Sequence, residues 1–104
     1  MGKTSWFDRN KHLYPPNWKE IADAVKDAAG RRCLGCGAPH GPPPHVLTVH
    51  HLDHVPMNCD DSNLLPCCQR CHLRLGPGIY TKEEAISRLQ RRAALDGLQR
   101  EMSL

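Results

Sequence analysis

The chain has 104 residues, of which 39% are hydrophobic and 5% aromatic, and its formal net charge is +3. A chain of this size buries only about two thirds of its unfolded surface, so we expect one small domain that needs a cross-link or a bound metal for stability. No stretch of about 20 apolar residues is present, which excludes a membrane-spanning helix, and the mild charge excludes strong global attraction to nucleic acid.

The first residues carry no apolar run of the kind that directs secretion. Met1 to Lys11 are polar and charged around Trp6 and Phe7. We therefore expect a cytoplasmic, reducing compartment without membrane contact, where Cys-x-x-Cys pairs usually bind metals or perform redox chemistry. We interpret residues 1–16 as an N-terminal arm and residues 17–96 as a single domain.

A first helix is predicted over residues 17–29. Asn17 is a good N-cap, and Glu20 follows three residues later, as a capping box requires. Gly30 can end the helix. The apolar residues at helical spacing are Trp18, Ile21, Ala22, Val25 and Ala29. We interpret this helix as packing support for the domain.

Two Cys-x-x-Cys pairs are the strongest metal signal in the sequence. Each pair supplies two thiolates, and together they match the four ligands of a closed, tetrahedral structural zinc site. Disulfides are the alternative, whereas thioredoxin-like chemistry needs a strand and helix context that is not visible here. The predicted zinc ligands are Cys33, Cys36, Cys68 and Cys71.

Cys59 and Cys67 belong to neither Cys-x-x-Cys pair. Cys67 adjoins Cys68 and could compete with it as a ligand, but only Cys68 has the two-residue spacing to the second cysteine of its pair. We interpret both spare thiols as small, buried or half-buried side chains.

A compact ββα core is predicted over residues 46–76. A run of β-forming residues at 46–49 delivers His50 and His51 at the end of a strand. Neighbouring strand residues point to opposite sides, so the two histidines cannot chelate one ion side by side. Residues 53–62 are rich in turn formers and should make an excursion from the sheet.

The chain then returns to this core. Asn63 begins a short second strand, and its amide should bond backbone groups across the excursion. A short helix over residues 69–75 carries His72 back to the strands. A further helix is expected over residues 82–95, with Thr81 as N-cap, and Gly97 should break it before a tail over residues 97–104. This last helix could pack on the domain or meet a protein partner or a second copy.

Local basic patches supply candidate nucleic-acid contacts, namely Arg31, Arg32, Arg70 and Arg74. We expect phosphate contact for Arg70 and Arg74, which lie next to the cysteine-histidine motif. The arginines at positions 88, 91 and 92 are better interpreted as an ordinary solvated helix face.

The order His-His, Asn and Cys-x-x-Cys-His, with an upstream Cys-x-x-Cys pair, resembles the zinc-knuckle branch of the HNH endonucleases. The resemblance covers Cys33 to Leu75. It implies a small α+β fold: a ββα-metal (His-Me finger) core held by a four-cysteine zinc site and flanked by an N-terminal and a C-terminal helix.

The resemblance also implies roles. His51 matches the general base that takes a proton from the attacking water, and Asn63 matches the asparagine that orients the loop. His72 matches a ligand of the catalytic metal, and His50 stands where the family has an aspartate or a histidine that also binds it. The further histidine that some relatives have one turn later is replaced by Gly76, so another group such as Arg74 or His54 would have to contact the transition state.

The implied function is metal-dependent nicking of duplex DNA with low sequence specificity. The cofactors would be one structural Zn²⁺ and one catalytic Mn²⁺, Mg²⁺, Ni²⁺, Co²⁺ or Zn²⁺; nitrogen ligands favour the others over Mg²⁺. The alternative is a non-catalytic, zinc-stabilised nucleic-acid-binding or adaptor module.

Overall fold

The computed structural model describes the backbone of residues 9–102 and the side chains of residues 9–97. Its elements, in chain order, are η1 (Lys11–Leu13), α2 (Trp18–Ala28), β1 (Leu47–His51), η2 (Asp61–Asn63), β2 (Leu64–Cys68), α3 (Gln69–Leu75) and α4 (Lys82–Met102). Residues 1–8 of the expected N-terminal arm and residues 103–104 of the expected tail lie outside this description.

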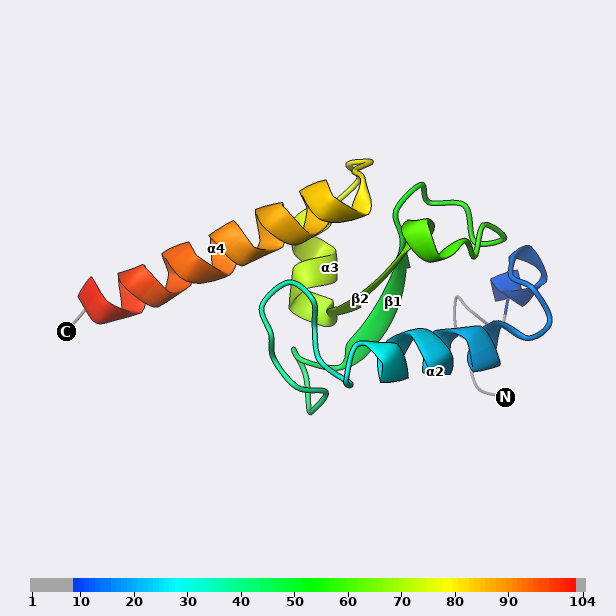
Figure 1. The fold of residues 1–104 in the computed structure, drawn as a ribbon, viewed down its shortest axis with the longest axis horizontal. Coiled ribbons are helices and arrows are strands. Elements are labelled where there is room, and N and C mark those ends of the chain that lie inside the picture. The colour runs from blue at the N-terminus through cyan, green and yellow to red at the C-terminus, as the bar shows by residue number, and fades with distance from the viewer. Residues whose placement is uncertain (1–8, 103–104) are drawn as a thin grey trace.

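The strands β1 and β2 form a two-stranded antiparallel sheet in which Leu47 pairs with Cys68 and His51 with Leu64. The helix α3 follows β2 directly and lies between the strands and α4, while α2 contacts both strands and lies on the side away from α3 and α4 (Figure 1). The predicted small α+β class is therefore confirmed. Pro66 is tolerated in β2 because a two-stranded sheet has only edge strands.

The core is small and consists largely of leucine and cysteine. Its buried members are Cys33, Leu47, Leu52, Leu65, Cys67, Cys68, Cys71, Leu75, Ala85 and Leu89. Each fully buried leucine contributes about 1.5–3 kcal/mol. Because the core includes three of the four predicted zinc ligands, packing and metal binding depend on the same residues.

The two ends of helix α2 differ in how well they match the predicted caps. Asn17 occupies the N-cap position, but its side chain makes no capping hydrogen bond, so the predicted capping box is wrong. Its backbone angles, φ −97° and ψ 25°, are not the extended ones from which a cap side chain reaches the first turn. Gly30 ends the helix as predicted: at φ 67° its N–H donates to Asp27, and Arg31 N–H donates to Lys26.

The helix α4 begins as predicted but runs further. Thr81 Oγ1 accepts the Glu84 N–H at 3.2 Å. The helix continues through Gly97 to Met102 rather than ending near Leu95, and its C-terminal part extends beyond the rest of the molecule (Figure 1). A glycine inside a helix costs only about 1 kcal/mol, which the helix-forming neighbours outweigh. Within the described residues, no helix is both long and apolar enough to cross a membrane.

Candidate metal centre and histidine cleft

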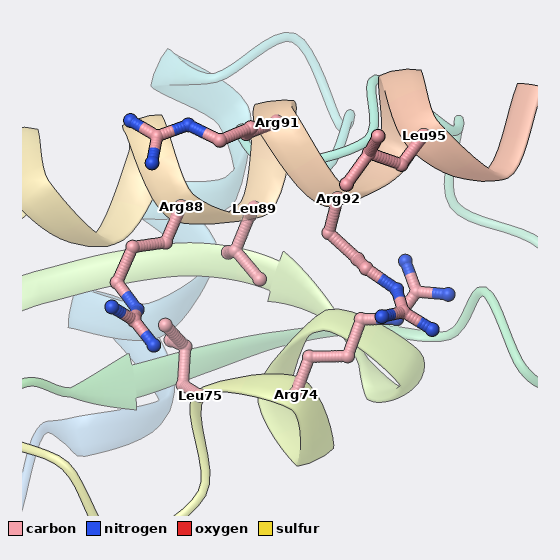
Figure 2. Close-up of a pocket in the computed structure, with 7 residues that line it drawn as sticks. All are labelled: Arg74, Leu75, Arg88, Leu89, Arg91, Arg92 and Leu95. Carbon is pink, nitrogen blue, oxygen red and sulfur yellow. The ribbon is translucent and has the colours of Figure 1, made fainter. Parts of the chain in front are cut away.

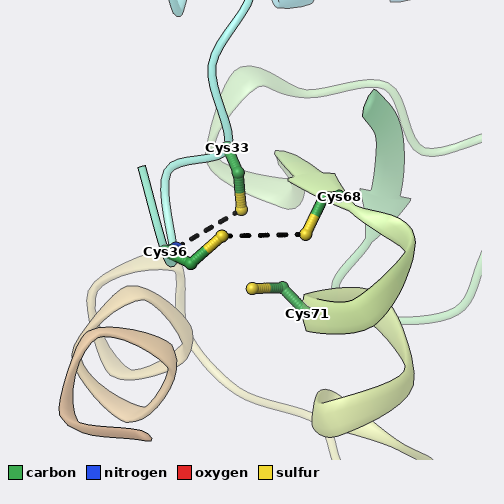
Figure 3. A group of neighbouring side chains, drawn as sticks. All are labelled: Cys33, Cys36, Cys68 and Cys71. Atoms are coloured by element: carbon green, nitrogen blue, oxygen red, sulfur yellow. Dashed lines mark hydrogen bonds between the residues drawn. The ribbon is translucent and has the colours of Figure 1, made fainter. Parts of the chain in front are cut away.

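The four cysteines of the two Cys-x-x-Cys pairs converge. Cys33 and Cys36 lie on the loop after α2, Cys68 ends β2, and Cys71 lies in the first turn of α3; their sulfurs all lie within 4.8 Å of one another and point to a common centre (Figure 3). The Cys36 and Cys68 sulfurs are 3.8 Å apart. Zinc–sulfur bonds of about 2.3 Å in a tetrahedron give an edge of about 3.8 Å, so the donor set fits Zn²⁺.

Backbone contacts shape the turn at residues 33–36, which contains the first Cys-x-x-Cys pair and which we call the first knuckle. The N–H groups of Gly35 and Cys36 donate to Cys33 Sγ at 3.3 and 3.5 Å. Leu34 N–H donates to the Pro66 carbonyl at 3.1 Å, which ties the knuckle to β2. A Cβ on Gly35 would lie 2.7 Å from Leu89 Cβ, so only glycine lets the knuckle approach α4 this closely.

The thiols of this cluster cannot all ionise on their own. Hydrogen bonding from Cys71 lowers the pKa of the Cys33 thiol to about 4. The same interaction raises the pKa of Cys71, and burial raises the pKa of Cys36, with the charge on Cys33 adding to both effects. A dication would remove this repulsion and take all four as thiolates.

The cysteines form no disulfide, and Cys59 and Cys67 lie outside the four-sulfur cluster. All six thiols are free, and 3.8 Å between Cys36 and Cys68 is far beyond a disulfide bond. Cys67 points into the core, where burial raises its pKa to about 12, so Cys68 rather than Cys67 joins the cluster. Cys59 is half-buried, with its sulfur 3.9 Å from His51 Nε2.

The paired histidines face different neighbours, as strand geometry requires. The His50 ring lies 4.5 Å from the His72 ring and 5.3 Å from the His54 ring. The His51 ring lies 4.8 Å from Trp18. Both line one cleft of about 420 Å³ together with Leu13, Tyr14, Val49, His54, Pro56 and His72. The fold thus brings three of the four predicted catalytic residues into one cleft.

Burial keeps these imidazoles neutral near pH 7. It lowers the pKa of His50 to about 4, and His72 and His54 add to the effect. Burial also lowers the pKa of His51 and of His72 below the ordinary value. Neutral ring nitrogens can accept a proton or bind a metal ion.

Asn63 lies outside the cleft lining and holds the excursion in place. Its Nδ2 donates to Asp53 Oδ1 and to the Asn58 carbonyl, both at 2.8 Å, and its Oδ1 accepts the Asp53 N–H at 2.9 Å. The predicted amide bonding across the loop is therefore present. Asp53 has a turn-forming role, since it also accepts hydrogen bonds from Val55 N–H and Asn58 Nδ2.

Tyr14 and Trp18 were not assigned a role at the cleft by the sequence, whereas His54 was a candidate for contact with the transition state. Tyr14 and Trp18 cover the His51 ring at 5.7 and 4.8 Å, and their rings are 5.4 Å apart. His54 adopts φ 62°, and its Nε2 lies 3.1 Å from the Gly78 carbonyl. Helical periodicity marks Trp18 as apolar packing, but it cannot show that the packing partner is a histidine of β1.

The predicted phosphate-binding arginines are mostly engaged within the chain. Arg31 pairs with Asp27 at 2.6 Å, and Arg32 donates to the Gly37 carbonyl at 3.3 Å. Arg74 pairs with Asp96 across α3 and α4. Arg70 is exposed on α3.

Comparisons with known proteins place the chain near one curated protein. No protein-family model and no solved structure matches it. The chain is similar to Zorya protein ZorE of Escherichia coli strain Crooks, with 29% identity over 94 residues, or 88% of the chain. It spans about a quarter of that relative, 26% of its length. The likeness thus concerns one part of ZorE.

Proposed function

We propose that the chain is a metal-dependent endonuclease of the HNH type that nicks DNA by hydrolysing phosphodiester bonds. The observation that carries the proposal is the cleft in which the His50 and His72 rings lie 4.5 Å apart, while His51, the next residue of β1, faces the adjoining part of the same space. The reaction needs metal ligands and, in an adjoining part of the site, a base. His50 and His72 could be the ligands, and His51 could be the base.

In this proposal His51 takes the proton from the attacking water. Its Nε2 faces the loop of residues 53–62 and lies 3.9 Å from Cys59 Sγ. This leaves Nδ1 to accept the proton of the water. The lowered pKa keeps the ring unprotonated at neutral pH, as a base must be. Asn63 is a positioning residue, because it fixes the loop that Nε2 contacts.

His50 and His72 would hold the catalytic ion through their ring nitrogens. Two nitrogen donors favour Mn²⁺, Co²⁺, Ni²⁺ or Zn²⁺ over Mg²⁺. When bound, such an ion supplies Lewis-acid polarisation of the scissile phosphate and stabilises charge on the departing 3′ oxygen. Within the described residues, the four cysteines are the one converging group of three or more metal ligands. The histidine site offers two ligands, His50 and His72, so water and phosphate would complete it.

The likeness to ZorE suggests a setting for this activity. ZorE is named a Zorya protein, and we propose that the chain acts in the same biological setting as this relative. Because the chain spans only 26% of ZorE, the activity of the whole relative is not transferred to it.

A plasmid assay tests the proposed activity. Zinc-loaded protein incubated with supercoiled plasmid and Mn²⁺ should produce nicked circles, and His51→Ala should abolish this while about one zinc per chain remains bound. His12→Ala, which changes an exposed histidine outside the cleft, is the matched control and should nick at the wild-type rate. Absence of nicking with every divalent metal would leave the endonuclease proposal without support.

A non-catalytic, zinc-stabilised nucleic-acid-binding module is the second candidate. The observation that favours it is the cover over His51, where Tyr14 and Trp18 restrict access of water to the ring. DNA binding without nicking, unchanged by His51→Ala, would select this candidate.

A further inference from the structure

A hollow of about 360 Å³ lies between α3 and α4, away from the histidine cleft. It is lined by Arg74, Leu75, Arg88, Leu89, Arg91, Arg92 and Leu95. The guanidinium groups of Arg74, Arg88 and Arg92 lie on one side of α4, whereas that of Arg91 points away from them (Figure 2).

The hollow carries an excess of positive charge that a single carboxylate does not neutralise. Asp96 accepts a hydrogen bond from Arg74, and its other oxygen lies 3.4 Å from Arg92 Nε. Arg88 stacks on the Tyr80 ring at 4.7 Å, which orients its guanidinium without using its N–H donors. Three cations against one anion leave a local excess that approaches the formal charge of the whole chain, +3.

The basic surface continues over α3. A second hollow is lined by Pro43, Pro44, Gln69, Arg70, Leu73 and Arg74. Because Arg74 lines both hollows, Arg70, Arg74, Arg88 and Arg92 form one continuous set, which we call the arginine surface. The leucines at its base are closed: Leu75 and Leu89 are 3% and 2% exposed.

We propose that the arginine surface binds the phosphodiester backbone of a nucleic acid outside the histidine cleft. The choice of nucleic acid rests on the proposed endonuclease function. Guanidinium groups match phosphate oxygens in pairs, and cations spread over two helices suit a repeating polyanion. An acidic peptide is the competing occupant, because Leu73 and Leu95, which are 82% and 50% exposed, also line the two hollows, and competition with polyglutamate separates the two occupants.

In the free protein, Asp96 occupies the place that a phosphate would take. Its carboxylate contacts Arg74 and Arg92, the two guanidiniums nearest each other in the hollow (Figure 2). A bound phosphate would therefore compete with Asp96. Neutralising this side chain should strengthen nucleic-acid binding, although it removes an ion pair from the fold.

Fluorescence anisotropy with a labelled duplex, in the His51→Ala background without added divalent metal, measures this binding. Arg88→Gln with Arg92→Gln should raise Kd roughly tenfold and reduce the slope of log Kd against log salt by about 2. Arg91→Gln removes one positive charge from the same helix, half of the change in the double variant, and we expect it to change Kd less than about twofold. Asp96→Asn should lower Kd roughly threefold.

Charge-conserving variants separate a binding role from a folding role. Arg88→Lys with Arg92→Lys should keep the salt slope of the parent. An unchanged Kd in the double glutamine variant, an equal effect of Arg91→Gln, or weaker binding by Asp96→Asn would overturn the proposal. Displacement of the duplex by polyglutamate as effectively as by unlabelled DNA would overturn it in favour of an acidic protein partner. Nicking by the otherwise wild-type chain is scored separately, so either proposal can fail alone.

Discussion

The His51 ring is packed on several sides. Trp18 and Tyr14 lie against its ring, and Cys59 Sγ faces its Nε2 at 3.9 Å. Such packing fixes one orientation of the imidazole, which favours proton transfer along one direction. It also limits the space near the ring, so a water must enter from the side of the cleft that His50 and His72 line.

Asn63 controls this arrangement from outside the cleft. Asn63→Ala should slow nicking about 10- to 100-fold and lower the free energy of unfolding by about 1–3 kcal/mol, because Asp53 N–H and the Asn58 carbonyl lose their partner. Plasmid nicking and urea denaturation measure the two effects.

Asn63→Asp sharpens this test. An aspartate can still accept the Asp53 N–H but cannot donate to Asp53 Oδ1, and it adds a second carboxylate beside the first. We expect it to be at least as damaging as Asn63→Ala. A variant as stable and as active as the wild type would show that the amide does not hold the loop.

At the scale of the elements, local rules predicted some features and failed for others. Spacing was enough for α3, since Gln69 to Leu75 forms the short helix as expected, and for the cysteine cluster, because a knuckle is a local turn. The capping box at Asn17 was wrong because the entry of the chain into α2 sets its backbone angles. The cover over His51 could not be predicted, since it depends on how α2 crosses β1.

The contact of the first knuckle with α4 gives a prediction at this scale. Gly35→Ala should lower the free energy of unfolding by about 1–3 kcal/mol, because its Cβ would lie 2.7 Å from Leu89 Cβ and force α4 outward. Thermal and urea denaturation of the zinc-loaded protein measure the loss.

Gly97→Ala is the matched control within α4. Among the described residues, no atom outside the adjoining turns of the helix lies within 4 Å of the added Cβ, and alanine favours helix, so stability should rise by up to about 1 kcal/mol. Equal destabilisation by the two substitutions would mean that the close approach at Gly35 is not what limits its replacement.

At the scale of the whole molecule, an ion held by the four-cysteine cluster would compensate for the small core. Its ligands come from the loop after α2, from β2 and from α3, so one ion would join most of the fold. This explains how a core of ten buried residues can suffice.

The assignment of the four zinc ligands predicts the zinc content of cysteine variants. Cys36→Ser should release about one zinc per chain and lower Tm strongly, whereas Cys67→Ala should keep the zinc and lose only about 1–3 kcal/mol through a core cavity. Metal analysis by mass spectrometry, together with thermal denaturation, decides the matter. Zinc loss from Cys67→Ala with retention by Cys36→Ser would reverse the ligand assignment.

The end groups of the cleaved DNA test the proposed hydrolysis most directly. If His51 activates water for attack on phosphorus and the 3′ oxygen departs, each nick must carry a 3′-hydroxyl and a 5′-phosphate, and DNA ligase should reseal it. Nicked plasmid produced with Mn²⁺ by the wild-type chain, and absent with His51→Ala, should therefore be ligatable without further treatment. Nicks that carry a 3′-phosphate, or nicking that persists in His51→Ala, would contradict the account.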